Sequence, residues 1–168
     1  IGLIGYGKTG KSFAKKLSGF NCNIIFCDIK TNLGDNYARE VKINELKETS
    51  DIISLHTNLN QSSRHIIDKQ FIDNCKKPFC LINTARGECI SNHDLIYGLE
   101  SDKIIGAGLD VLENENKDFE GIAVDQNLEK LKKFKNVILT PHIAGWSKES
   151  KVKLAQITVN KIKEFLDL

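Results

Sequence analysis

Short apolar runs alternate with longer amphipathic stretches along this chain of 168 residues. Several of the runs are continuously apolar, a pattern that is typical of strands covered on both faces of a parallel sheet. The pattern predicts strands at residues 1–4, 23–27, 51–56, 78–83, 103–110 and 136–140.

The stretches between and after these runs have the spacing of amphipathic helices. In the first of them, Phe13, Ala14 and Leu17 recur at intervals that place them on one helical face. The pattern predicts helices over residues 8–20, 91–101 and 147–168. Strands that alternate with helices in this way indicate a doubly wound, mostly parallel α/β sheet.

A polar stretch at residues 113–129 predicts a loop that is longer than most connections between elements. Long loops of α/β domains often border a functional site, because binding residues tend to lie on loops that a rigid sheet positions. We therefore expect this loop to border one.

Charge and hydropathy argue against two classes of partner. The 24 basic and 22 acidic side chains leave a formal charge of only +2, and the lysines are spread along predicted helical faces. That spread is typical of a solvated surface, so we expect no nucleic-acid partner. The sequence contains no apolar run of the roughly 18–20 residues that a membrane span needs, so we expect no membrane partner.

The cysteines are an odd number and include no C-x-x-C pair. Several of them lie inside predicted strands, which indicates buried free thiols rather than disulfides or metal ligands. We therefore predict no metal site and a reducing compartment, the cytoplasm. The five positions are Cys22, Cys27, Cys75, Cys80 and Cys89.

A glycine-rich segment joins the first predicted strand to the first predicted helix. It contains Gly5, Gly7 and Gly10 in a G-x-G-x-x-G pattern, with Lys8 and Thr9 before the last glycine. Such glycines permit a tight turn, close approach of the backbone to a pyrophosphate, and close packing of the helix on the strand. The N-terminus of the helix would then offer N–H groups and a partial positive charge to the phosphates.

An acidic residue, Asp28, ends the next predicted strand, 18 residues after Gly10. A carboxylate at this position is suited to accept hydrogen bonds from an adenosine ribose, and it would repel a 2′-phosphate. The combination predicts a Rossmann-type dinucleotide-binding domain that prefers NAD to NADP. Lys30, close by in the sequence, reduces the strength of that preference.

Three further residues follow predicted strands and have ionisable side chains that could take part in catalysis. Arg86, Asp110 and His142 each stand at or just beyond the carboxyl end of a strand, which is the edge where ligands bind in an open α/β sheet. A guanidinium, a carboxylate and an imidazole beside a nicotinamide are the groups that oxidation of a 2-hydroxy acid requires. Taken alone, Arg86 and His142 are more typical of a surface or strand-end position, and only their order after the glycine loop favours catalysis.

In these segments the chain resembles the cofactor-binding domain of the D-isomer-specific 2-hydroxyacid dehydrogenases, which include D-lactate, glycerate and 3-phosphoglycerate dehydrogenases. The resemblance rests on ordered motifs that together cover nearly the whole chain: IGLIGYGKTG, LHTNLNQSSRHII, INTARG, GAGLDVLENE and TPHIAGW. It implies NAD as the cofactor, and hydride transfer between NAD(H) and a D-2-hydroxy acid or 2-keto acid.

The resemblance also implies a role for each catalytic residue. Arg86 would hold the substrate carboxylate and polarise its C2 oxygen through charge-assisted hydrogen bonds. His142 would act as general base in oxidation and as general acid in reduction. Glu115 would orient the ring of His142 and raise its pKa. A glutamate at this position also favours a hydroxy acid over formate as the substrate.

By the same resemblance, several other residues would line the cofactor, with Asp110 on the nicotinamide side. The set comprises Gly5, Gly7, Lys8, Thr9, Gly10, Asp28, His56, Thr57, Thr84, Ala85, Asp110 and Gly145. The resemblance further implies a homodimer.

Members of this family wrap a second domain around the cofactor domain, and that second domain is not part of this sequence. The chain contains no methionine, and its first residue already lies in an apolar run. We therefore expect residues 1–168 to be one dinucleotide-binding domain of a larger two-domain enzyme, poorly active alone. Two alternatives remain open: a non-catalytic NAD(H)-binding sensor of the corepressor type, and a stand-alone nucleotide-binding module.

Overall fold

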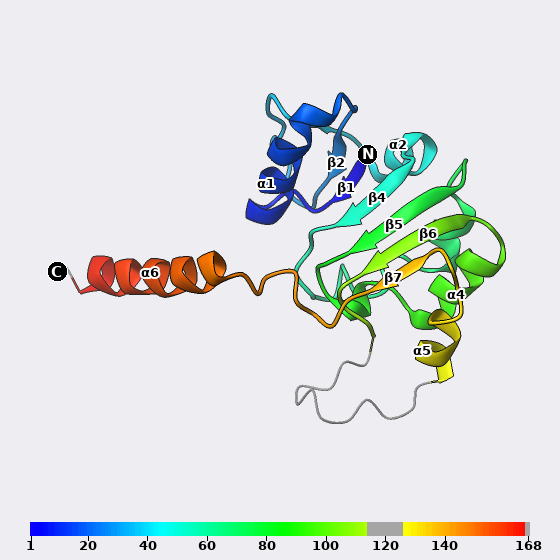
Figure 1. The fold of residues 1–168 in the computed structure, drawn as a ribbon. Coiled ribbons are helices and arrows are strands. Elements are labelled where there is room, and N and C mark those ends of the chain that lie inside the picture. The colour runs from blue at the N-terminus through cyan, green and yellow to red at the C-terminus, as the bar shows by residue number, and fades with distance from the viewer. Residues whose placement is uncertain (114–125, 167–168) are drawn as a thin grey trace.

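The computed structural model describes residues 1–113 and 126–166, and its centre is one seven-stranded sheet (Figure 1). Every pair of neighbouring strands is parallel, in the order β3-β2-β1-β4-β5-β6-β7. The strands are β1 (Gly2–Ile4), β2 (Ile25–Cys27), β3 (Arg39–Glu40), β4 (Ile52–Leu55), β5 (Phe79–Asn83), β6 (Ile104–Leu109) and β7 (Val137–Leu139). The predicted doubly wound parallel sheet is confirmed.

Helices connect the strands and follow the last of them. They are α1 (Lys8–Leu17), α2 (Ile43–Thr49), α3 (Lys69–Asp73), α4 (Asn92–Glu100), α5 (Gln126–Leu131) and α6 (Lys148–Phe165), with short 3₁₀ turns at Ser18–Phe20 and Gly87–Cys89. The three predicted helices are confirmed, although the first becomes a 3₁₀ turn after Leu17. The six predicted strands are confirmed with one or two residues fewer at their ends.

One sequence prediction is wrong. Residues 113–129 were expected to form a loop, but α5 begins at Gln126. Leu131, at the end of α5, is fully buried in the main core, so packing in this core stabilises a helix that its polar sequence does not predict. Residues 114–125 of the predicted loop lie outside the described residues.

The register of the strands divides the core between the two faces of the sheet. Leu3 pairs with Phe26, and both belong to a small cluster with Ala14 of α1. On the opposite face, Ile53 pairs with Leu81 in a larger cluster that includes residues of α2, α3, α4 and α5. Thus α1 covers one face near β1 and four helices cover the other, whereas Ile138 of β7, on the face of α1, remains 71% exposed.

The strand order reverses between β1 and β4. From β1 the chain winds outward to β2 and β3, and then returns to form β4 on the other side of β1. A reversal of this kind opens a crevice at the carboxyl ends of the two strands, and this is where α/β sheets bind ligands. The segments after β1 and β4 therefore define the first place to look for a site.

The last helix, α6, extends away from the sheet in Figure 1, and it has no buried residue within its described length. Its large apolar side chains are about half exposed or more, including Leu154 at 69% and Phe165 at 87%. Of the helices in the described residues, none is long and apolar enough to cross a membrane.

Candidate functional site

The glycine loop after β1 has the geometry that its sequence predicts. Gly5 has a φ of 94°, a left-handed conformation that favours glycine. A Cβ on Gly5 would lie only 2.7 Å from the carbonyl oxygen of His56, and a Cβ on Gly10 would overlap the carbonyl oxygen of Gly5. These two glycines are therefore required by the packing of the loop itself.

Gly7 differs from the other two glycines. Among the described atoms, none lies within 4 Å of a Cβ built on this residue, so the loop itself does not require a glycine there. Gly7 is also the N-cap of α1, and no described side chain caps this helix end. Lys8 and Thr9 follow it, both exposed. An open, uncapped helix N-terminus next to a glycine is suited to hold a phosphate group.

Asp28 follows β2 and lies beside the glycine loop. Its Oδ2 accepts a hydrogen bond from the backbone N–H of Tyr6 at 2.6 Å, and its Oδ1 accepts one from the backbone N–H of Lys30 at 2.9 Å. A carboxylate has about four acceptor positions, so each oxygen retains capacity for a ribose hydroxyl. The glycine loop thus holds the side chain of Asp28 in place.

Tyr6 is a contributor that sequence reasoning missed. Its fully buried ring stacks on Phe26 with centroids 3.8 Å apart, and its hydroxyl donates to Asp35 at 2.8 Å. Burial raises the pKa of this phenol above its ordinary value, and the hydrogen bond to Asp35 raises it further. Tyr6 therefore joins the glycine loop to the segment after Asp28 as a neutral donor.

His56 follows β4 and lies directly against the glycine loop. Its Nε2 is 3.0 Å from the hydroxyl of Ser54, its ring packs near that of Phe13, and its buried Nδ1 has no hydrogen-bond partner among the described residues. Burial lowers the pKa of the imidazole to about 4. The ring is therefore neutral near pH 7 and cannot serve there as a cationic group.

Arg86 lies in the loop after β5. Asn83, at the end of that strand, donates from Nδ2 to the carbonyl oxygen of Arg86 at 3.0 Å and accepts from the N–H of Ala85 at 3.0 Å. The Arg86 residue is exposed, and its Nη1 donates to the carbonyl oxygen of Ala85 at 2.6 Å. A fixed backbone with an exposed guanidinium is suited to bind a carboxylate from solution.

Asp110 follows β6 and organises the turn after β7. Its Oδ1 accepts from the hydroxyl of Thr140 at 2.5 Å and from the N–H of Ile143 at 2.9 Å, and its Oδ2 accepts from the N–H of Ala144 at 2.8 Å. Burial alone would raise the pKa of Asp110, but these three hydrogen bonds and the nearby His142 hold it below the ordinary value. The carboxylate is therefore charged at neutral pH.

His142 lies in the middle of this turn. Its φ of 53° is left-handed, and its N–H donates to the carbonyl oxygen of Thr140 at 3.0 Å. A residue with a Cβ adopts such a backbone only where its surroundings impose it, and Asp110 accepts hydrogen bonds from the residues on either side. Asp110 thus holds the turn that carries His142, the residue that the sequence predicts for acid–base chemistry.

The remaining predicted site residues fall at the same edge of the sheet, with one outside the described residues. Thr57 follows β4 and its Oγ1 lies 3.4 Å from the sulfur of Cys89, while Thr84 is exposed in the loop after β5. Gly145 is exposed at the end of the turn that carries His142. Glu115 lies outside the described residues.

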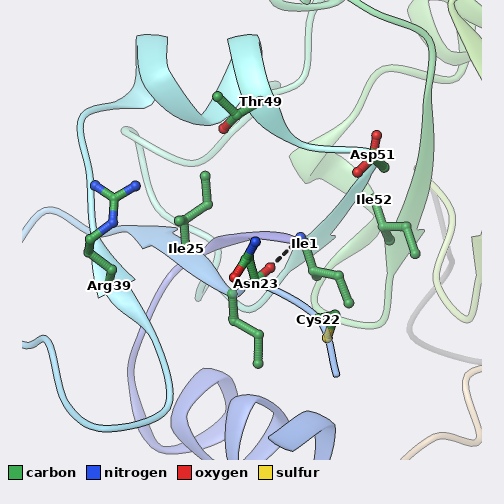
Figure 2. A pocket seen from close by; sticks show the side chains of 9 residues that line it. Ile1, Cys22, Asn23, Ile25, Arg39, Thr49, Asp51 and Ile52 are labelled. Carbon is green, nitrogen blue, oxygen red and sulfur yellow. Dashed lines mark hydrogen bonds between the residues drawn. The ribbon is translucent and has the colours of Figure 1, made fainter. Parts of the chain in front are cut away.

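A hollow of about 740 Å³ lies elsewhere, at the amino ends of β1, β2 and β4 (Figure 2). Two of its charged side chains are already paired, because Arg39 lies 2.7 Å from Glu45 and Asp51 lies 2.6 Å from Lys77. It opens on the edge opposite to the glycine loop and Arg86. We therefore place the candidate site at the carboxyl ends of the strands.

Comparison with known proteins relates the chain to one family. Residues 1–144 match the family model described as "D-isomer specific 2-hydroxyacid dehydrogenase, NAD binding domain". The chain is 34% identical over 170 residues to a D-specific alpha-keto acid dehydrogenase of Enterococcus faecium. It is 36% identical over 172 residues to an aromatic 2-oxoacid reductase of Clostridium sporogenes. Both alignments cover 98% of this chain and 52% of the relative, so the chain spans about half the length of these curated relatives.

The fold is also similar to that of solved structures. The crystal structure of a D-isomer specific 2-hydroxyacid dehydrogenase from Lactobacillus delbrueckii ssp. bulgaricus, in its NAD-complexed form, superimposes with a TM-score of 0.87 at 31% identity. The match covers 95% of this chain and 52% of that one.

Proposed function

Because the chain belongs to the family of D-isomer-specific 2-hydroxyacid dehydrogenases, we propose that its protein transfers a hydride between NAD(H) and a D-2-hydroxy acid or 2-keto acid. NAD is the cofactor of this domain. The observation that carries the proposal is the placement of Arg86, Asp110 and His142 after the adjacent strands β5, β6 and β7, at the edge that holds the glycine loop.

The residues present fit a dinucleotide. Gly7 leaves open space at an uncapped helix N-terminus, which would receive the pyrophosphate together with the N–H groups near Lys8 and Thr9. Asp28 would accept hydrogen bonds from the adenosine ribose. Thr57, Thr84 and the other predicted lining residues would complete the pocket. When bound, NAD(H) supplies the hydride chemistry.

The catalytic work of the chain would fall to Arg86 and His142. Arg86 would pair with the substrate carboxylate and fix the orientation of its C2 atom. His142 would take the hydroxyl proton during oxidation and return it during reduction. Asp110 would keep the imidazole in place through the turn that it organises, and we propose Glu115 as the partner that orients the ring.

We further propose that residues 1–168 are the dinucleotide-binding domain of a larger two-domain enzyme, homodimeric and cytoplasmic, and poorly active in isolation. The exposed apolar side chains of α6, such as Val152, Leu154 and Ile157, support a contact with another domain or subunit. A second domain would exclude water from the bound substrate.

Site-directed variants of the full-length protein test the proposal. His142→Ala should lower kcat for 2-keto acid reduction by about 10²–10⁴-fold, because a general acid is lost, and should leave NADH affinity unchanged. Arg86→Lys should raise KM, because a lysine cannot form the bidentate pair with a carboxylate. His93→Ala, whose side chain is 85% exposed, is the matched control and should retain full activity.

The same variants separate the alternatives. A sensor of the corepressor type would keep nucleotide-dependent partner binding after His142→Ala and would show no turnover beforehand. A stand-alone nucleotide-binding module would bind NADH but reduce no 2-keto acid. Wild-type turnover that survives His142→Ala at full rate would rule out the assigned acid–base role.

A further inference from the structure

Three loops at the site meet at one side chain, Glu113. Its Oε1 lies 2.7 Å from Nε2 of His65, in the loop after β4. Its Oε2 accepts a hydrogen bond from the backbone N–H of Asn92, the first residue of α4, at 2.9 Å. Glu113 itself follows β6, three residues after Asp110. One carboxylate therefore joins the segments that follow three adjacent strands.

The backbone next to Glu113 also packs tightly against the loop of Arg86. Gly87 is buried, and a Cβ on it would overlap the carbonyl oxygen of Leu112 and lie 2.6 Å from the backbone nitrogen of Glu113. Because Arg86 directly precedes Gly87, residues 112–113 cannot shift towards this loop without displacing the backbone next to Arg86.

His65 connects Glu113 to the same loop by a second route. Its N–H donates to the carbonyl oxygen of Glu88 at 2.8 Å, and the N–H of Ile67 donates to that of Cys89 at 3.1 Å. The φ of His65 is 49°, an unfavourable backbone that persists only where the surrounding contacts hold it. The Glu113 carboxylate supplies such a contact to the ring.

The environment of Glu113 gives these contacts more weight than a surface ion pair has. The side chains of Glu113 and His65 are 19% and 41% exposed, whereas Glu100 and Lys130, in an ion pair at the other end of α4, are 52% and 50% exposed. Solvent screens an exposed pair and reduces its contribution to nearly nothing, while hydrogen bonds to a partly buried carboxylate remain strong.

We propose that Glu113 is a positioning residue that holds the Arg86 loop where its guanidinium meets the carboxylate of the substrate. The inference rests on the proposed function and deepens it. Glu113 acts through His65, Asn92 and the backbone at Gly87. Binding of the substrate carboxylate therefore depends on Glu113, whereas binding of the cofactor depends on the glycine loop and Asp28.

Hydrogen exchange in the full-length protein tests the structural half of this inference. In Glu113→Ala, the amides of His65, Ile67 and Cys89 should exchange about tenfold faster than in the wild type, because the loops that they join open more often. Glu100→Ala removes an exposed carboxylate from α4 and should leave these amides unchanged. Glu113→Gln should restore most of the protection, since its amide oxygen still accepts from Asn92.

Steady-state kinetics with NADH and a 2-keto acid test the functional half. Glu113→Ala should raise KM for the 2-keto acid by between about tenfold and a hundredfold, because a displaced Arg86 no longer meets the carboxylate. The affinity for NADH should stay within about twofold of the wild type, and Glu113→Gln should recover most of the KM.

Unchanged amide exchange in Glu113→Ala would overturn the inference. So would faster exchange without any rise in KM, or a loss of NADH affinity as large as the rise in KM. If the wild type reduces no 2-keto acid, the proposed function fails, and exchange at the three amides alone then decides whether Glu113 holds the Arg86 loop.

Discussion

The imidazole of His56 is neutral in the folded chain because burial lowers its pKa to about 4. In the unfolded chain the same group titrates near its ordinary pKa of 6.5. As the pH falls from about 6.5 towards 4, the unfolded chain binds a proton that the folded chain does not, so this group destabilises the fold progressively. Above about pH 6.5 the group is neutral in both the folded and the unfolded chain, so it no longer lowers the unfolding free energy.

The first prediction follows from this pKa. The difference between 6.5 and about 4 corresponds to a loss of about 3 kcal/mol of unfolding free energy across this pH range. His56→Gln should remove most of that pH dependence, as measured by urea denaturation at pH 7, 5.5 and 4. The exposed His93 provides the control, since His93→Gln should keep the wild-type slope. An equal slope in His56→Gln would show that burial of this ring is not its cause.

The second prediction concerns Gly7, where the fold leaves room for a side chain but the ligand would not. Gly7→Ala should lower the melting temperature only slightly, because the added Cβ meets no other element and the cost is limited to the weaker preference for alanine at a helix N-cap. It should weaken NADH binding about tenfold or more, because the Cβ occupies the approach to the pyrophosphate. Gly19→Ala, which is equally unobstructed, should change neither quantity when both are measured by thermal melting and fluorescence titration.

Local sequence predicted some of these residue roles and not others. The glycine pattern and Asp28 were predictable because a strand, a turn and a helix N-terminus follow one another along the chain. The partners of Asp110 were not predictable, since Thr140 and Ala144 lie about thirty residues away and meet it only when β6 and β7 pair. The role of Glu113 was missed for the same reason, and its neighbour Glu115 drew attention through the family motif instead.

At the scale of elements, continuous apolar runs predicted the central strands well, because burial on both faces leaves a clear pattern. The missed elements carry few buried residues. The strand β3 consists of Arg39 and Glu40 alone, and α2 buries only Leu46. The five-residue α3 depends on a cap, in which Asp68 accepts from the N–H of Phe71 at 2.7 Å. Tertiary contacts, rather than periodicity, stabilise such short segments.

The third prediction compares two helices that differ in burial. Leu131→Ala should destabilise the chain by about 2–5 kcal/mol, because its side chain is fully buried in the core and its removal leaves a cavity. Leu154→Ala on α6, where the residue is 69% exposed, should change the unfolding free energy by less than about 0.5 kcal/mol. Chemical denaturation of the 168-residue chain measures both. A large effect of Leu154→Ala would mean that α6 packs on the sheet in solution.

At the scale of the whole molecule, the parallel sheet brings every loop of the proposed site to one edge. The reversal of strand order places the glycine loop and His56 side by side, and β5, β6 and β7 add Arg86, Asp110 and His142 in succession. The fold class and the edge were predictable from the alternation of strands and helices. The exposure of the apolar side chains of α6 was not predictable. The periodic pattern predicts an amphipathic helix, but it does not predict what the apolar face packs against.

We propose that this edge reduces 2-keto acids with NADH to give the D-isomer. The most direct test is to follow NADH oxidation by the full-length protein with a panel of 2-keto acids and to determine the configuration of the product. We expect one NADH to be consumed for each 2-hydroxy acid formed, with the D configuration only. Formation of the L-isomer, or NADH binding without reduction of any 2-keto acid in the panel, would contradict it.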